Sequence, residues 1–183
     1  KRAMKSAAAA ASAARPFTSS AQTGVRAVPS SDESAWSATA RRALSLGLRR
    51  VAGVLFRPVL SYAPGHTWLH RRRSGALELG LDDLAQRLLP SVTAVELPRP
   101  GTVVERGQPI ATLHGGGRAV SIPAPISGTV AGVNAAVLRD PALVKRDGYG
   151  KGWFVAMTPA DAAWEALPRA QDAESFLRKE AAR

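Results

Sequence analysis

The sequence predicts a small, mainly β domain with a helical extension at each end. From Tyr62 onward, short apolar stretches are broken by Gly or Pro roughly every 8–12 residues, which is typical of a sandwich or barrel. Apolar residues at helical spacing before residue 60 and after residue 160 indicate the extensions. The pattern divides the chain into residues 1–33, 34–60, 61–160 and 161–183.

The first segment, residues 1–33, is basic and rich in Ala and Ser. Its first 31 residues hold 10 Ala, 6 Ser and 5 basic residues and no Asp or Glu, a composition typical of organelle transit peptides. The run Arg15-Pro16-Phe17-Thr18-Ser19-Ser20 is similar to the Arg-x-Phe-x-x-Ser pattern near mitochondrial processing sites. The alternative is an Ala/Ser-rich tail without a targeting role.

Residues 34–60 are predicted to form an amphipathic helical extension, with the helix itself over about 34–56. One face carries Ala40, Leu44, Leu48, Val51 and Leu55, and arginines lie on the other face. The first interpretation is a helix that docks on its own domain or on a partner. The alternative is contact with an anionic membrane surface through residues 34–57.

The middle segment, residues 61–160, contains the candidate strands and two short helices. Strands are predicted at about 66–72, 76–81, 92–98, 108–114, 118–123, 127–134 and 152–158. Glycines at 75, 101, 107, 115–117 and 128 are expected to supply positive-φ turns. Asp82-Asp83 opens one helix, whose buried side is predicted to be Leu81, Leu84 and Leu88, and a helical turn is expected near Pro141. Residues 161–183 indicate one or two helices, separated near Pro168.

Composition excludes several kinds of site. The chain has no cysteine, so disulfides, a thiolate nucleophile and iron–sulfur ligation are excluded. The formal charge of +11 suggests an anionic partner, but residues 1–60 carry +8 of it and residues 61–160 only +4. Arg49, Arg50 and Arg57 interrupt the most apolar stretch, so a membrane-spanning helix is not expected.

No motif in the chain predicts catalysis or metal binding. His66 and His70 share one side of their segment but lack an evident third ligand. The Arg71-Arg72-Arg73 cluster has no interleaved aromatic residue, so a solvated strand end is favoured over a nucleic-acid site. Glycines 115–117 are not followed by the Lys-Ser/Thr of a phosphate loop. We therefore expect a protein that is not an enzyme and has no metal.

Residues 62–160 contain a set of motifs that occur together in one family. They are Tyr62-x-x-x-His66-Thr67-Trp68-Leu69, Gly80-Leu81-Asp82-Asp83-Leu84-Ala85-Gln86, Val95-Glu96-Leu97-Pro98-x-x-Gly101, Ala124-Pro125-Ile126-Ser127-Gly128, Val133-Asn134 and Asp147-Gly148-Tyr149-Gly150-x-Gly152-Trp153. This set resembles the H protein of the glycine cleavage system, a relative of lipoyl domains. The resemblance implies a sandwich of two half-barrels.

The same resemblance implies a lipoyl cofactor, but this chain lacks the lysine that would carry it. An H protein carries lipoate on one lysine at a hairpin tip, and counting back from Ala124 places that position at Gly117. The neighbouring Arg118 is not a substitute, since a guanidinium stays protonated and is not acylated. No lysine lies between Lys5 and Lys145, so a small shift of the alignment does not restore the site.

Three functions follow as hypotheses. The first is a non-lipoylated H-protein-like module, an accessory or structural subunit of a larger protein complex, with no cofactor and no small-molecule substrate. The second is a working lipoate carrier of glycine cleavage. The third is a basic adaptor that binds a membrane surface or, less expected, nucleic acid. The transit-peptide pattern favours a mitochondrial location, with the bacterial cytoplasm as the alternative.

Overall fold

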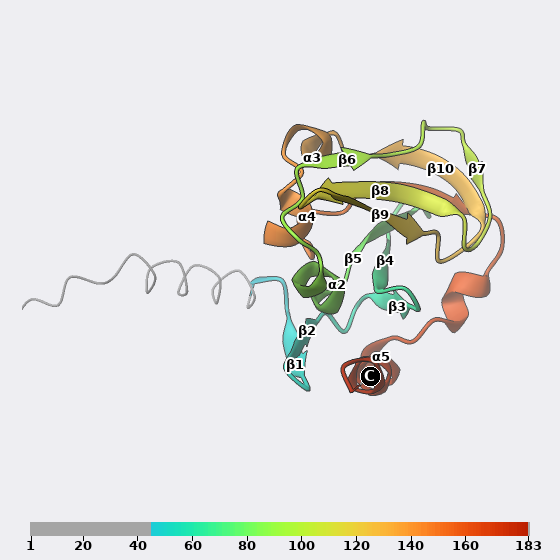
Figure 1. Ribbon diagram of the computed structural model, residues 1–183. Coiled ribbons are helices and arrows are strands. Elements are labelled where there is room, and N and C mark those ends of the chain that lie inside the picture. Colours follow the sequence, from blue (N-terminus) through green and yellow to red (C-terminus); the bar gives the residue numbers. More distant parts are fainter. Residues whose placement is uncertain (1–44, 183) are drawn as a thin grey trace, which may run out of the picture.

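The computed structural model describes residues 45–182, and their fold is mainly β (Figure 1). A six-stranded antiparallel sheet has the order β3-β4-β5-β11-β10-β7, and a three-stranded antiparallel sheet has the order β6-β8-β9. Strands β1 and β2 form a separate hairpin. The strands are β1 Arg49–Val51, β2 Val54–Phe56, β3 Ser61–Ala63, β4 Thr67–Arg71, β5 Leu77–Leu81, β6 Ala94–Glu96, β7 Val103–Val104, β8 Pro109–Gly115, β9 Arg118–Pro123, β10 Gly128–Val133 and β11 Val155–Pro159.

The main core lies between the two larger sheets. Leu79 of β5 and Met157 of β11 face it from the six-stranded sheet, and Ile110 and Leu113 of β8 face it from the three-stranded sheet. All four are at most 2% exposed. The expected sandwich is confirmed, and the predicted strands lie within a few residues of their expected positions. The short strands β3 and β7 lie outside the predicted strand ranges.

A second core forms on the outer face of β3 and β4. Side chains alternate along a strand, so Tyr62 and Trp68 point away from the main core while Ala63 and Leu69 point into it. Gly80 pairs with Trp68 across the sheet, and a Cβ there would lie 2.3 Å from the indole ring. The missing side chain of Gly80 therefore makes room for Trp68.

The C-terminal segment forms the expected helices and covers this second core. A 3₁₀ helix, η1 Ala163–Ala166, is followed by α5 Ala170–Glu180. Helix α5 contacts β1 and β3, and its Ala173 and Leu177 are buried in the second core. Trp164 instead joins the main core.

The predicted helix over residues 34–56 is wrong over residues 46–56; within the described part of this range, only Ser45 is helical. Residues 49–56 form the β1–β2 hairpin, in which Arg49 pairs with Phe56 and Val51 with Val54. Its turn is Ala52-Gly53, at φ 47° and 80°. Of the predicted helix face, Val51 is buried in this ribbon, but the other buried residues, Val54 and Phe56, did not belong to that face. Residues 34–44, and the transit-peptide pattern in 1–33, lie outside the described residues.

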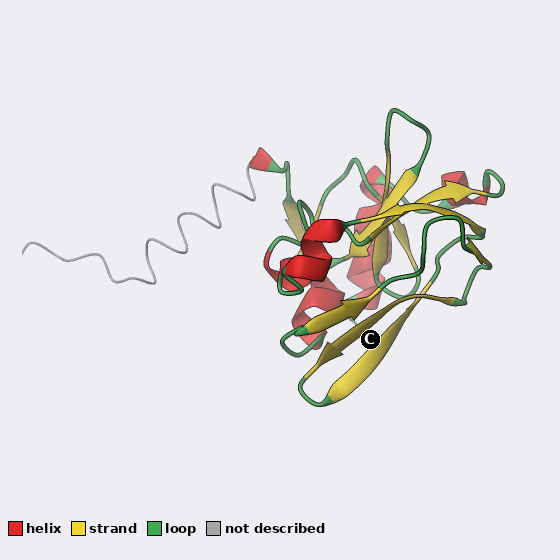
Figure 2. Cartoon of the chain, turned by 90° about the horizontal axis from the view of Figure 1, so that it is seen from above, coloured by secondary structure: helices red, strands yellow, loops and turns green. Residues whose placement is uncertain are grey.

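The remaining helices are short and gather at one side of the sheets (Figure 1 and Figure 2). They are α2 Asp83–Leu88, α3 Ala135–Arg139 and α4 Leu143–Arg146. The helix at Asp82-Asp83 and the turn near Pro141 are confirmed as α2 and α4, and α3 was not predicted. The predicted buried side of α2 is partly wrong, because Leu88 is 73% exposed and Leu84 is half-buried.

Two glycines act through close packing and not through a positive φ. The turn glycines 75, 101, 107, 116 and 117 have positive φ, as predicted, whereas Gly115 and Gly128 do not. A Cβ on Gly128 would lie 2.3 Å from the carbonyl oxygen of Thr158 on the neighbouring strand. Within residues 45–182, no helix has the length and apolar character needed to cross a membrane.

Candidate functional site

The β8–β9 hairpin places Gly117 at its tip. Gly115 pairs with Arg118 across the hairpin, which leaves Gly116 and Gly117 as a two-residue turn. Both have positive φ, 58° and 72°, as the tight turn between twisted strands requires. A Cβ built on Gly117 meets no atom within 4 Å, so this position faces open space.

The hairpin tip rests on the segment between α2 and β6. A Cβ on Gly115 would lie 1.7 Å from the carbonyl oxygen of Ser91, and one on Gly116 would lie 3.1 Å from Pro90. The backbone of the tip is thus held directly against residues 90–91. Gly115 is required by this approach, since any side chain there would collide with backbone.

The tip offers an imidazole and a guanidinium but no amine. His114 Nε2 lies 2.9 Å from Glu96 Oε1 on the neighbouring strand, and Arg118 begins β9. Lysines occur in the described part of the chain only at 145, 151 and 179. Lys145 Nζ donates to the Leu89 carbonyl from α4, and Lys179 lies on α5. None of these lysines belongs to the hairpin.

His66 and His70 each face a carboxylate of their own. His66 Nδ1 lies 3.2 Å from Asp82 Oδ2, and His70 Nδ1 lies 3.3 Å from Glu78 Oε2. Their separate carboxylates do not converge, and no group of three His, Cys, Asp or Glu side chains suited to a metal occurs within residues 45–182.

The Arg71–Arg73 cluster makes contacts that its local sequence does not reveal. The Arg71 guanidinium lies 5.6 Å from the Trp164 ring centre, and that of Arg72 lies 4.7 Å from the Trp153 ring centre. Arg72 also pairs with Glu78. The aromatic partners come from much later in the chain, so neighbouring residues gave no signal of them. Two of the three arginines are thereby held within the protein's own structure.

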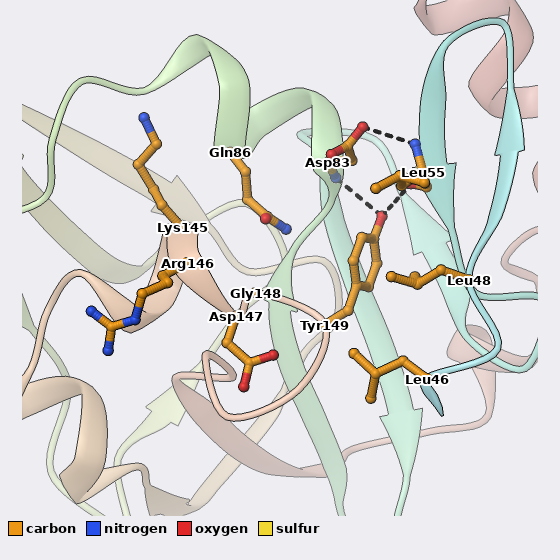
Figure 3. A pocket seen from close by; sticks show the side chains of 10 residues that line it. All are labelled: Leu46, Leu48, Leu55, Asp83, Gln86, Lys145, Arg146, Asp147, Gly148 and Tyr149. Carbon is orange, nitrogen blue, oxygen red and sulfur yellow. Dashed lines mark hydrogen bonds between the residues drawn. The ribbon is translucent and has the colours of Figure 1, made fainter. Parts of the chain in front are cut away.

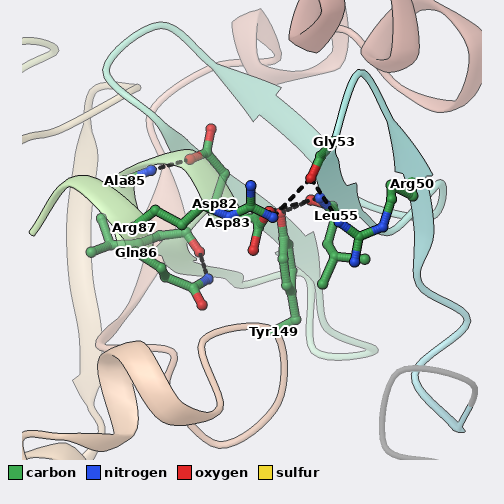
Figure 4. Close-up of polar contacts among 10 residues, drawn as sticks. Arg50, Gly53, Leu55, Asp82, Asp83, Ala85, Gln86, Arg87 and Tyr149 are labelled. Carbon is green, nitrogen blue, oxygen red and sulfur yellow. Dashed lines mark hydrogen bonds and ion pairs between the residues drawn. The ribbon is translucent and has the colours of Figure 1, made fainter. Parts of the chain in front are cut away.

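A network of buried polar groups fastens the β1–β2 hairpin to the domain (Figure 4). The Tyr149 hydroxyl accepts from Asp83 N at 3.0 Å and donates to the Leu55 carbonyl at 2.8 Å. Asp83 Oδ2 accepts from Leu55 N at 2.8 Å and pairs with Arg87, whose guanidinium also reaches Gly53 O at 2.8 Å. Burial raises the pKa of Tyr149 far above its usual value, so its hydroxyl keeps the proton that it donates.

Asp82 and Asp83 thus do more than favour the helix dipole. Asp82 caps α2 by accepting from Ala85 N at 2.8 Å, while Asp83 binds the backbone of β2. The sequence placed both at the start of a helix, and the cap confirms that position. The contact with Leu55 was missed because the segment around Leu55 was expected to be helical.

A hollow of about 200 Å³ opens beside this network (Figure 3). One wall is apolar and is made by Leu46, Leu48 and Leu55 together with the Tyr149 ring. The opposite side carries polar groups from α2 and from α4 with the loop after it, namely Gln86, Lys145, Arg146 and Asp147. We call it the hairpin-side hollow.

A second hollow, of about 360 Å³, shares Lys145 and Arg146 with the first. It is lined by these two residues with Ser91, Val92 and Ala142. Because Ser91 also contacts Gly115, this hollow adjoins the base of the hairpin tip. We call it the tip-side hollow.

Comparison with known proteins gives a consistent result. The family model described as "Glycine cleavage H-protein" matches residues 60–180. The chain is 38% identical over 117 residues to the glycine cleavage system H protein of Shewanella loihica, an alignment that covers 64% of this chain and 89% of the relative. It is 38% identical over 119 residues to that of Psychrobacter cryohalolentis, covering 64% and 94%.

An additional relative and a solved structure extend this likeness. The probable glycine cleavage system H protein 2 of Sulfurisphaera tokodaii is 42% identical over 90 residues, covering 49% of this chain and 61% of the relative. The crystal structure of a glycine cleavage system H protein from Mycobacterium marinum superposes with a TM-score of 0.59 at 25% identity. That superposition covers 68% of this chain and 99% of the other.

Proposed function

The chain belongs to the glycine cleavage H-protein family, and from this premise we propose that it is a non-lipoylated member that acts as an accessory or structural subunit of a larger protein complex. One observation carries the proposal. The position at which the family resemblance expects the lipoyl lysine is Gly117, at an open hairpin tip without an amine.

The residues at the tip do not fit an amide-linked lipoyl group. Such a link needs a primary amine, and the turn consists of Gly116 and Gly117 followed by Arg118, whose guanidinium is not acylated. Lys145, although half-buried near the tip-side hollow, is bound to the Leu89 carbonyl and lies on a different element. We therefore assign no cofactor and no catalytic residue to this chain.

The preserved scaffold supports a binding role in place of carrier chemistry. The two larger sheets retain a continuous core, so loss of the lysine is not accompanied by loss of the fold. The β1–β2 hairpin precedes the family-matched region and is fastened to it through Leu55, Asp83 and Tyr149. Such an addition enlarges the surface that a protein partner can contact.

Two alternatives remain hypotheses. A working lipoate carrier is favoured by the family assignment and opposed by Gly117. A basic adaptor for membrane or nucleic acid loses support because residues 49–56 form a hairpin and Arg72 is paired with Glu78. For the compartment, the mitochondrial prediction rests on residues 1–33, while the Shewanella and Psychrobacter relatives are bacterial proteins and favour the bacterial cytoplasm.

Native purification combined with genetic complementation tests the proposal. We expect the full chain to elute from its source with a partner protein at fixed stoichiometry. We also expect it to leave glycine oxidation unrestored in a strain that lacks its own H protein. Restored glycine oxidation would support the carrier alternative, and elution as a free monomer would contradict the accessory role.

A further inference from the structure

Two basic residues of α4 are shared by the two hollows. Lys145 and Arg146 line both the hairpin-side hollow and the tip-side hollow. The tip-side hollow is bounded otherwise by Ser91, Val92 and Ala142, and it is open to solvent beside the hairpin tip. A peptide segment bound across this face would therefore contact the charged ends of Lys145 and Arg146 where they border the two hollows.

The surroundings of α4 also expose apolar side chains. Leu88 on α2 is 73% exposed and Leu138 on α3 is 47% exposed. Neither leucine lines the tip-side hollow, but α2 and α3 both contact α4, and Leu88 immediately precedes Leu89, whose carbonyl binds Lys145. Exposed aliphatic side chains near a hollow are typical of protein-binding surfaces, which bury apolar groups at their centre.

The basic side chains on this face differ in whether they are paired with a carboxylate. Arg146 pairs with Asp140, and Arg87 pairs with Asp83. Within residues 45–182, the contact found for the Lys145 ammonium is the neutral carbonyl of Leu89. An ammonium has three N–H donors, so Lys145 has donors left for an incoming carboxylate. Asp147 lines the hairpin-side hollow, whereas the residues that line the tip-side hollow include no carboxylate. A partner for the tip-side hollow is thus expected to be acidic.

From this arrangement we propose that the tip-side hollow, with Lys145 and the exposed Leu88, docks an acidic aliphatic segment of a partner protein. A Glu or Asp of that segment pairs with Lys145, and an adjacent aliphatic side chain enters the hollow beside Val92. This deepens the proposed function and rests on it, because it names the surface and the chemistry through which an accessory subunit binds its partner.

A titration of the full chain with a defined probe tests this docking site. The probe is a synthetic peptide of repeating Glu-Glu-Leu, followed by amide chemical shifts of the isotope-labelled protein. We expect the shifts to concentrate at Leu88, Val92, Ala142 and Lys145. A peptide with Lys in place of Glu, a peptide of Glu alone, and inorganic polyphosphate serve as comparison ligands, and each is expected to bind more weakly.

Two variants separate the charge from the apolar contact. Lys145→Gln keeps a donor for the Leu89 carbonyl but loses the charge, and we expect peptide affinity to fall about fivefold, the upper range for a partly exposed ion pair. Leu88→Ser removes an exposed side chain without touching the core and should also weaken binding. Lys151→Gln, at an exposed lysine outside the hollow, is the matched control and should bind as the wild type does.

Three results would overturn the proposal: equal affinity of Lys145→Gln and Lys151→Gln, shifts scattered over the basic surface, or polyphosphate binding as tightly as the peptide. The last would indicate a general anion surface. These results are separable from failure of the proposed function. A lipoyl adduct on the wild-type chain would reject the accessory role whether or not the peptide binds.

Discussion

The Tyr149 hydroxyl donates to the carbonyl of Leu55 at 2.8 Å, a contact between residues 94 positions apart. Leu55 lies in the β1–β2 hairpin, before the family-matched residues 60–180, and Tyr149 lies in the loop after α4. The same hydroxyl accepts from Asp83 N, so one side chain joins the hairpin, α2 and that loop. The N-terminal addition is therefore integrated into the domain through a buried polar group.

Replacing this group should loosen the hairpin. Tyr149→Phe keeps the ring stacked on Trp68 but leaves the Asp83 N–H and the Leu55 carbonyl without this partner. We expect the free energy of unfolding to fall by about 1–3 kcal/mol, the cost of buried polar groups left unsatisfied. Urea denaturation measures the loss, and hydrogen exchange at residues 54–56 should become faster.

Tyr62→Phe is the comparison for this variant. The Tyr62 hydroxyl accepts from Arg57 N, outside β2, and also contacts the Tyr149 hydroxyl, but its loss leaves the bonds of Tyr149 to Asp83 and Leu55 in place. Tyr62→Phe should therefore lower stability while speeding exchange at residues 54–56 less than Tyr149→Phe does. Equal exchange rates for the two variants at these residues would show that Tyr149 does not fasten the hairpin.

The hairpin tip should tolerate a side chain at Gly117 far better than at Gly115. A Cβ on Gly115 collides with the Ser91 carbonyl, and we expect Gly115→Ala to cost at least about 2–3 kcal/mol, as in overpacked sites. Gly117→Ala meets no atom and should cost only about 1–2 kcal/mol for its positive φ. Denaturation midpoints of the two variants decide the order, and a reversed order would place the close contact elsewhere.

His66 should give the fold a dependence on pH. Its hydrogen bond to Asp82 is the largest cause that raises the pKa of His66 above its ordinary value, and the charge of Glu180 adds to it. The protonated form is therefore favoured by folding. This stability is fully present below the unfolded pKa of about 6.5 and is lost as pH rises through the raised folded pKa.

The His66→Gln variant tests this dependence. We expect it to be less stable than the wild type at about pH 5.5, with the difference shrinking at pH values above the raised pKa. Thermal melting across this range provides the measurement. In an Asp82→Asn background, which keeps an acceptor for Ala85 N but loses the charge, the dependence should largely disappear. An unchanged dependence there would assign it to another group.

The β core could be predicted from the sequence because it is encoded locally. Short apolar stretches broken by Gly or Pro marked the positions of β4, β5, β8, β9 and β10. The hairpin tip at Gly116-Gly117 followed from the same signals. Nothing in the local sequence distinguished Gly115 from Gly116 and Gly117. Glycine is required at position 115 because a side chain there would collide with the Ser91 carbonyl, and a contact between distant segments leaves no local pattern.

The N-terminal extension was mispredicted for a related reason. Val51 and Leu55 are spaced as on a helix, and the choice of a β-ribbon depends on tertiary partners. These are Asp83 and Tyr149, which bind Leu55, and α5, which packs on β1. The two hollows were not foreseen either, since each is formed by elements far apart in the chain.

Intact-mass analysis of the protein purified from its source tests most directly whether this family member has lost its carrier role. We predict that the chain carries no lipoyl adduct, before or after incubation with a lipoate ligase. The Gly117→Lys variant is the matched control, because its side chain would project from the open tip. Gain of a lipoyl mass by that variant alone is the expected result. A lipoyl adduct on the wild-type chain would contradict the proposal.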